Sequence, residues 1–307
     1  MKRRDFISKS VCTGVAVGTG FTFLSLEKAF GNIVPNLQSP YDLVAVLGGE
    51  PEEMYEKGIA EFGGIKNFVK AGQTVVVKPN IGWDRTPEFG ANTHPGLISK
   101  IIKECLAAGA KDVFVFDNPV DNWQRAYATS GIEKAAKDAG ATVITGNSER
   151  NYKDVVIPNG KLLKSAKVHE KIIECDVFIN VPVLKHHGGA QITIAMKNLM
   201  GIVWDRQYWH NNNLQQCIAD MVSYRKPDLN IIDGYRVMKR NGPKGVSIND
   251  VSLEKAQIIS KDIVAADAAA ARIFGREPET IAHIRIANEM GFGEMDISKL
   301  NINRIRI

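Results

Sequence analysis

The side chains best suited to chemistry are gathered just after one apolar run in the middle of the chain. Val177–Val181 is followed within a few residues by Lys185, His186 and His187, and then by two glycines. A lysine and imidazoles beside glycines that open a helix can serve an anion site, a metal site, or both. We therefore predict that Lys185 and His186 are catalytic and that His186 can also ligate a metal ion. His187 points the opposite way on an extended backbone, so the two imidazoles are not expected to share one ion.

The same segment continues with a second group of candidates. Ala190–Met200 has the pattern of a helix and carries Lys197 and Asn198, which we predict to bind a cofactor or an anionic group. His210 closes the aromatic and polar run that follows, and we assign it, with His186, as a candidate metal ligand. For His210 a structural role fits the sequence equally well. A plain loop would be expected to hold one such side chain, whereas this segment holds several.

Polar side chains also follow the ends of other apolar runs. Lys78 and Asn80 come directly after three valines, Asp117 follows a Phe-Val-Phe run, and Asp233 follows an Asn-Ile-Ile run. His94 precedes a proline suited to the first turn of a helix, where backbone N–H groups favour an anion. We predict that His94 and Asp117 are catalytic and that Lys78, Asn80 and Asp233 bind a cofactor. Taken alone, each of these residues also fits a structural role.

Short apolar runs alternate with amphipathic segments along the chain, and this alternation predicts the fold. It favours an α/β fold with a mainly parallel sheet and helices on both faces, in which ligands bind beyond the carboxyl ends of the strands. Residues 32–307 are predicted to form a single domain, which could have two lobes. Gly109 and Gly140 fit the C-caps of helices. The expected strands are Leu43–Leu47, Val75–Val77, Val113–Phe116, Thr142–Ile144, Val177–Val181, Asn230–Ile232 and Gln257–Ile259. The expected helices are Pro95–Ala108, Asn122–Ala139, Leu214–Ser223 and Asp262–Phe274.

The composition is that of a globular protein. The chain has 307 residues, of which 44% are apolar and 24% charged, with a net charge of +5. The first 31 residues carry five basic and two acidic side chains, so +3 belongs to them and only +2 to the rest. A nearly neutral body does not favour nucleic acid as a partner, since that binding depends on neutralising many phosphates. No uncharged apolar stretch after the N-terminus is long enough for a membrane span.

Residues 1–31 have the plan of an export signal: a basic start, a moderately apolar segment and small residues at the end. Arg3 and Arg4, followed by Asp-Phe-Ile, resemble the pattern of a twin-arginine signal. The resemblance implies export to the periplasm or beyond, with the twin-arginine translocase as a partner. That route carries folded proteins, which often hold a cofactor. The alternative is a short N-terminal helix with chance arginines.

The cysteines do not form a recognisable pattern. Cys12 lies in the leader, and Cys105, Cys175 and Cys217 are too far apart for a C-x-x-C pair or a tidy disulfide framework. Cys105 and Cys217 lie among apolar residues at helical spacing, so we expect both to be buried. An iron–sulfur cluster held by this chain is not expected, because the closely spaced thiolates are absent.

Several ordered motifs between residues 43 and 293 resemble the DUF362 family, a family of unknown function. They include Lys78-Pro79-Asn80, Thr93-His94-Pro95, Asp117-Asn118-Pro119, Pro182–His187, Lys197–Gly201, Asp233-Gly234, Gly242-Pro243 and Asp262–Asp267. Some members carry an added ferredoxin-like domain, whose cysteine-rich motifs this chain lacks. The lysine and histidine motifs at strand ends are also similar, more weakly, to the catalytic domain of nickel-pincer lactate racemases, which use histidines as acid–base groups.

Two functions fit these observations. The first is an exported enzyme acting on a small anionic substrate by proton or hydride transfer, assisted by a divalent metal or an organometallic cofactor. The lysines would neutralise a carboxylate or phosphate, and the two strand-end aspartates would orient a histidine or ligate a cation. The second is a non-catalytic periplasmic protein that binds or delivers an anion or a metal. Both require the basic and imidazole side chains to converge on one edge of the sheet.

Overall fold

The computed structural model describes residues 39–307, so the predicted export signal lies outside the described residues. The part of the chain that it describes contains no helix long and apolar enough to cross a membrane. Its strands are β1 (Leu43–Leu47), β2 (Thr74–Pro79), β3 (Asp112–Val115), β4 (Thr142–Val143), β5 (Tyr152–Val156), β6 (Ser165–His169), β7 (Val177–Val181), β8 (Val183–His187), β9 (Gln191–Thr193), β10 (Leu229–Met238), β11 (Val251–Ser260) and β12 (Ile302–Arg306). Its α-helices are α3 (Pro51–Ala60), α4 (Pro95–Ala107), α5 (Trp123–Thr129), α6 (Ile132–Asp138), α7 (Glu170–Glu174), α8 (Ala195–Asn198), α9 (Gln207–Asn211), α10 (Leu214–Val222), α11 (Ile263–Phe274) and α12 (Ala282–Glu289).

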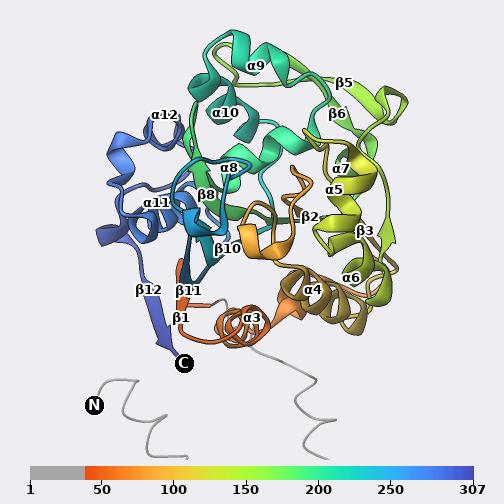
Figure 1. Cartoon of the computed structure of the whole chain (residues 1–307), viewed down its shortest axis with the longest axis vertical. Helices are drawn as coiled ribbons and strands as arrows, with labels where there is room; N and C mark the ends of the chain where they lie inside the picture. Colours follow the sequence, from red (N-terminus) through yellow and green to blue (C-terminus); the bar gives the residue numbers. More distant parts are fainter. Residues whose placement is uncertain (1–38) are drawn as a thin grey trace, which may run out of the picture. The chain divides into compact units, whose positions relative to one another are not determined.

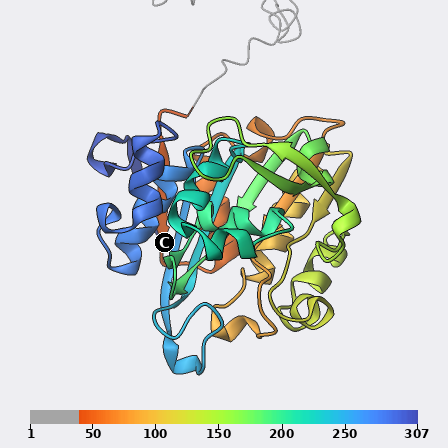
Figure 2. The same ribbon diagram turned by 90° about the horizontal axis from the view of Figure 1, so that it is seen from above.

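Ten of these strands form one mixed sheet that is mainly parallel (Figure 1). The order across the sheet is β12-β1-β11-β10-β7-β2-β3-β4, with β8 beside β10 and β9 beside β8. Pairing is parallel from β10 through β7, β2 and β3 to β4, and antiparallel where β11 meets β1 and β10. β10 and β11 form a long hairpin that extends beyond the rest of the sheet (Figure 2). The predicted α/β fold class is therefore confirmed.

Helices cover both faces of the sheet because successive side chains of a buried strand point to opposite sides. In β2, Val75 and Val77 pack in one apolar cluster with α3, α4 and α6, whereas Val76 packs in the other with α8, α10 and α11. In β7 the same alternation places Ile179 in the first cluster and Phe178 in the second. Figure 1 shows α3 and α4 on one side of the strands and α8 and α10 on the other.

Most of the expected elements are present, with two corrections. The helix expected over residues 122–139 is two helices, α5 and α6, because Gly131 between them has a φ of 73°. The helix expected over residues 190–200 is wrong: the segment holds β9, the single turn α8 and the start of a 3-10 helix, Leu199–Ile202. Pairing of β9 with β8 takes up the first part of that segment. Gly109 and Gly140 follow helices with positive φ, as expected.

A row of buried polar side chains crosses the middle of the sheet. Lys78 of β2, Asn180 of β7, Asn230 of β10 and Ser260 of β11 are register partners, and none is exposed to solvent. The Asn180 amide donates to Asn230 Oδ1 and to the Ala195 carbonyl at the start of α8, both at 3.1 Å. Buried polar groups of this kind are tolerated only when they are paired. The row therefore ties the sheet to α8, which carries two of the candidate site residues.

Replacement of Asn180 tests this connection. We expect Asn180→Ala to lower the free energy of unfolding by at least about 2 kcal/mol, because it removes the donor that serves the buried Asn230 Oδ1 and the buried Ala195 carbonyl. Equilibrium unfolding in urea measures the change. Asn159→Ala, at an exposed turn, serves as the control and should change stability by less than about 0.5 kcal/mol. Equal stability of the two variants would contradict a stabilising role for the row.

Candidate active site

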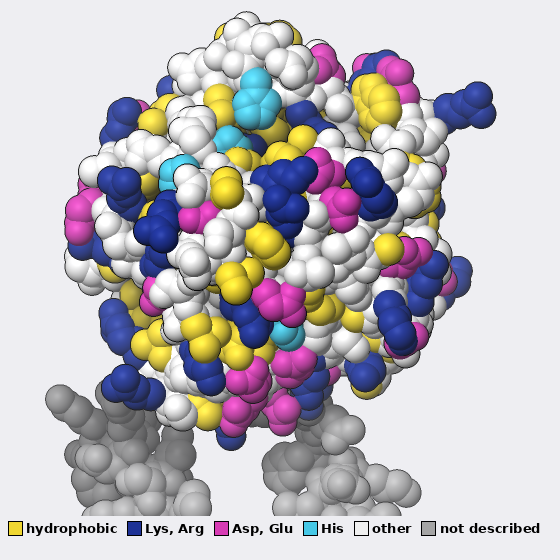
Figure 3. All heavy atoms as spheres, in the orientation of Figure 1, with side chains coloured by type: hydrophobic (Ala, Val, Ile, Leu, Met, Phe, Trp, Pro, Cys, Tyr) yellow, Lys and Arg dark blue, Asp and Glu magenta, His cyan; other side chains and the backbone are white. Residues whose placement is uncertain are grey.

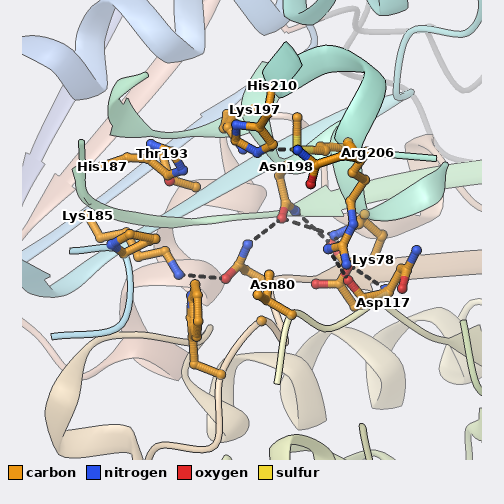
Figure 4. Close-up of a pocket in the computed structure, with 18 residues that line it drawn as sticks. Lys78, Asn80, Asp117, Lys185, His187, Thr193, Lys197, Asn198, Arg206 and His210 are labelled. Carbon is orange, nitrogen blue, oxygen red and sulfur yellow. Dashed lines mark hydrogen bonds and ion pairs between the residues drawn. The ribbon is translucent and has the colours of Figure 1, made fainter. Parts of the chain in front are cut away.

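A cavity of about 400 Å³ opens where the parallel strands β2 and β3 end, beside β8. On this face, histidine and basic side chains surround a hollow below α9 (Figure 3). Figure 4 shows the lining side chains pointing toward one another from β2, β8, α8 and the α9 region. Seven of the ten predicted site residues line the cavity: Lys78, Asn80, Asp117, Lys185, Lys197, Asn198 and His210.

A buried ion pair forms the floor of the cavity. Lys78 Nζ lies 2.9 Å from Asp117 Oδ1, and it also donates to Asn198 Oδ1 at 3.0 Å and to a backbone carbonyl at 2.7 Å. Asp117 accepts, in addition, the backbone N–H groups of Ile81 (2.6 Å) and Asn118 (2.8 Å). Burial lowers the pKa of Lys78, and the charge of Asp117 opposes that effect. Every hydrogen of this ammonium group is therefore taken up within the protein.

The ion pair leaves no space above it for a side chain. A Cβ atom at Gly201 would lie 1.8 Å from Asp117 Oδ1 and 2.6 Å from Lys78 Nζ. Only glycine lets the 3-10 turn after α8 pass this close to the pair.

Two amides link the ion pair to a second lysine. Asn198 Oδ1 accepts from Asn80 Nδ2 at 2.9 Å, and Asn80 Oδ1 accepts from Lys185 Nζ at 2.9 Å. Asn198 Nδ2 donates to Asn180 Oδ1 at 2.9 Å, which joins the cavity to the polar row. Because each amide has a donor on one side and an acceptor on the other, its orientation is fixed.

The other two lysines have fewer partners. Lys185 also donates to the Ala91 carbonyl, so it has two uncharged oxygen acceptors. Lys197 Nζ has one polar contact in the described part of the chain, with the thioether sulfur of Met200 at 3.1 Å. Burial lowers the pKa of each lysine to about 7; for Lys197 the charges of Arg206 and Lys78 act in the same direction. Both groups therefore change charge near physiological pH.

The imidazoles of His187 and His210 stack over the cavity, with ring centroids 6.3 Å apart. Nδ1 of His187 accepts the backbone N–H groups of Gly189 (3.1 Å) and Ala190 (3.0 Å), so the proton of the neutral ring lies on Nε2. Burial, with the charges of Lys197 and Lys185, lowers the pKa of His187 to about 3. Burial also lowers the pKa of His210. His187 therefore offers one fixed N–H donor.

Arg206 is a cavity residue that the sequence did not single out. Its guanidinium donates to the carbonyls of Asn118 (2.6 Å) and Pro119 (2.8 Å), and no carboxylate among the described residues lies within ion-pair distance of it. Those carbonyls directly follow Asp117, so the site itself positions the arginine. The only signal in the sequence was its place in the aromatic run that ends at His210.

The structure does not bring His94 and Asp233 to this cavity. Side chains two residues apart on a strand point to the same face, so Asp233 lies on the same side of β10 as Ile231. Ile231 packs in the apolar cluster that contains α4. Its carboxylate accepts the backbone N–H of His94, at the N-terminus of α4 (2.7 Å), and that of Tyr235 (3.0 Å). Burial raises the pKa of Asp233. Expecting both residues in the same cavity was therefore wrong, because the end of a strand does not specify the face.

His186 is also absent from the cavity lining. On the extended β8 it points away from His187, as expected for neighbouring residues, and its Nδ1 accepts the backbone N–H of Gly242 at 3.1 Å. The predicted metal pair of His186 and His210 therefore does not meet there. Within residues 39–307, no three His, Cys, Asp or Glu side chains are grouped closely enough to hold a metal ion.

Comparison with known proteins places the chain among its relatives. The family model described as "Domain of unknown function (DUF362)" matches residues 75–272, a range that contains every residue lining the cavity. A thylakoid-associated protein of Synechocystis sp. is 26% identical over 238 residues, which cover 75% of this chain and 71% of that protein. Among solved structures, the apoprotein of lactate racemase from Thermoanaerobacterium thermosaccharolyticum matches with a TM-score of 0.44 and 12% identity. The match covers 83% of this chain and 58% of that one.

The ion pair on the cavity floor makes a direct prediction about stability. Asp117→Ala should lower the free energy of unfolding by about 3–5 kcal/mol, because it leaves the Lys78 ammonium buried without its counter-charge. The double variant Lys78→Met/Asp117→Ala should recover a large part of that loss, and urea unfolding measures both. Asp154→Ala, which removes an exposed carboxylate, is the control. If the double variant is as unstable as Asp117→Ala, the buried charge is not the cause.

Proposed function

This chain belongs to the DUF362 family, and we propose that it is an enzyme that binds a small anionic substrate in the cavity and transfers a proton on it. One observation carries the proposal. Three basic side chains, Lys185, Lys197 and Arg206, face one cavity, and in the described part of the chain none has a carboxylate within ion-pair distance. The one carboxylate that the described residues place in the lining, Asp117, is already held by Lys78 and two backbone N–H groups.

The surplus of positive charge supports an anionic ligand. Buried cations without a counter-ion are costly, and an entering carboxylate or phosphate removes that cost. Lys185 and Arg206 come from opposite ends of the cavity as drawn in Figure 4, so they can hold two anionic oxygens or two anionic groups. A volume of about 400 Å³ suits a small metabolite.

Two kinds of group can move a proton in this cavity. His210 is exposed at its edge, and its lowered pKa keeps the ring neutral and able to accept a proton at neutral pH. Lys185 and Lys197, with pKa values of about 7, can each give up or take a proton in the same range. His187 has a fixed Nε2–H group, which donates a hydrogen bond without titrating. No metal ion is needed for this assignment, and no step of it uses one.

Anion binding and its pH dependence test the proposal. Oxalate, titrated calorimetrically, should bind more weakly as the pH rises through 7, because Lys185, with a pKa of about 7, loses the proton that attracts the anion. An anion favours the charged form of Lys185, so binding at pH 7 should take up protons from the buffer. Lys185→Met should weaken binding by about tenfold or more, while Lys103→Met, at an exposed position, should not. An absence of binding by any small anion would contradict the proposal.

Proton transfer has a separate test. Candidate acids incubated with the protein in deuterated water should exchange a carbon-bound hydrogen, followed by NMR, and His210→Ala should slow that exchange by about 100-fold. Anion binding with no exchange in any acid would instead favour the alternative function, a protein that binds or delivers an anion without catalysis.

We also propose export by the twin-arginine pathway, supported by the resemblance of residues 1–31 to its signals. Lys-Lys replacement of Arg3 and Arg4 should retain the full-length chain in the cytoplasm of an export-competent bacterial host. Fractionation followed by immunoblotting measures the distribution. Equal export of both forms would contradict the assignment, and Lys9→Gln, in the same leader, is the control.

A further inference from the structure

The three lysines of the cavity differ in the number of oxygen atoms that accept their hydrogens. Lys78 has three such acceptors and Lys185 has two. Lys197 has none in the described part of the chain, because its one polar contact is the sulfur of Met200. A thioether is a weak acceptor, and Lys197 is only 8% exposed. A charged ammonium group is therefore poorly accommodated at this position, whereas a neutral amine fits it.

The neighbours of Lys197 favour the neutral amine as well. Burial lowers the pKa of Lys197 most, and the charges of Arg206 and Lys78, each held in place by its own hydrogen bonds, lower it further. The charge of Asp117 acts in the opposite direction and is the smallest of these effects. Desolvation and a neighbouring cation are the two conditions that convert a lysine into a nucleophile. The amine also borders open space, since Lys197 lines the cavity.

The backbone on both sides of Lys197 is fixed. Preceding it, the Asp267 carboxylate accepts the N–H groups of Ala195 (2.7 Å) and Met196 (3.1 Å) at the start of α8. Following it, Asn198 is held by Asn80 and by Lys78. Since α8 is a single turn between two anchors, the amine is presented to the cavity from a rigid support.

From this arrangement we propose that Lys197 is a nucleophile that forms an imine with the aldehyde or ketone group of an anionic substrate. The substrate class is then an oxo acid, whose carboxylate is bound by Lys185 or Arg206. The inference rests on the proposed function, because it uses the same cavity and names the class of anion.

The chemistry needs no further reactant. The nitrogen lone pair adds to the carbonyl carbon, a C–N bond forms, the carbonyl π bond breaks, and the oxygen receives a proton shed by nitrogen. The resulting carbinolamine loses its hydroxyl group together with the remaining nitrogen-bound proton, so amine and carbonyl give imine and one water. Protonation of the imine nitrogen makes the neighbouring carbon-bound hydrogen more acidic, which connects this step to the proton transfer proposed above.

Trapping of the imine is the test. The full-length chain is incubated at pH 7 with glyoxylate and cyanoborohydride, which reduces an imine to a stable carboxymethyl amine. Peptide mapping by mass spectrometry should find the carboxymethyl group on Lys197. At a pKa of about 7, its neutral fraction at pH 7 is about a thousandfold that of an ordinary lysine, so labelling at least about tenfold above any surface lysine is expected.

Matched variants and a binding control separate the outcomes. Lys197→Met should lose the label while keeping the fold by thermal unfolding, and Lys103→Met should keep both. If Lys197→Met does not fold, peptide mapping of the unaltered protein is the test: a label on Lys197 supports the imine, and a label elsewhere contradicts it. Calorimetry with glyoxylate and with oxalate, which has no aldehyde or ketone, runs in parallel. Binding of both anions without a label on Lys197 overturns the imine and leaves the proposed function standing; absence of both binding and label overturns both.

Discussion

The site depends on one buried ion pair, Lys78 with Asp117. Its ammonium group is fully excluded from solvent, so its charge is tolerated only because three acceptors surround it. Those acceptors come from β2 itself, from Asp117 two residues beyond the end of β3, and from α8, elements that are far apart in the sequence. Satisfying one lysine therefore brings together the ends of two strands and the turn that carries Lys197. Asn198 accepts a hydrogen bond from Lys78 and donates one to Asn180, so it connects the ion pair to the polar row across β7, β10 and β11.

The same pair decides the electrostatics of the cavity. Among residues 39–307, Asp117 is the only carboxylate in the lining, and its oxygens are occupied by Lys78 and by two backbone N–H groups. Lys185, Lys197 and Arg206 therefore have no internal counter-ion among the described residues. Burial lowers the pKa of Lys185 and of Lys197 to about 7, whereas Arg206 keeps its charge. The counter-charge must therefore come from the ligand, so the site selects a ligand first by its negative charge.

The sequence predicted seven of the twelve strands in the described part of the chain and seven of the residues that line the cavity. Its errors about the site share a physical cause. Lys78, Asn80 and Asp117 were found because polar residues at the ends of parallel strands meet at one edge of the sheet. The same rule failed for Asp233, since alternation directs it to the face of α4 rather than to the cavity. The rule also does not tell which of two neighbouring histidines faces the cavity: His186 was the predicted site residue, whereas His187 lines the cavity. Edge position follows from a strand pattern alone, whereas the choice of face depends on which helices cover the sheet, and that is a property of tertiary packing.

Arg206 and the support of α8 were missed for a related reason. Arg206 is oriented by backbone carbonyls, and α8 begins against the Asp267 carboxylate, which comes from a helix some seventy residues later in the chain. Burial raises the pKa of Asp267 to about 8, so this anchor is held at an energetic cost that packing around it must offset. Fixing the backbone of α8 at this cost would add little to anion binding, because a long lysine side chain can reach an anion from a less ordered backbone. It is useful where a single amine must meet a carbon atom at a defined position and angle, because bond formation is far more sensitive to placement than charge attraction is.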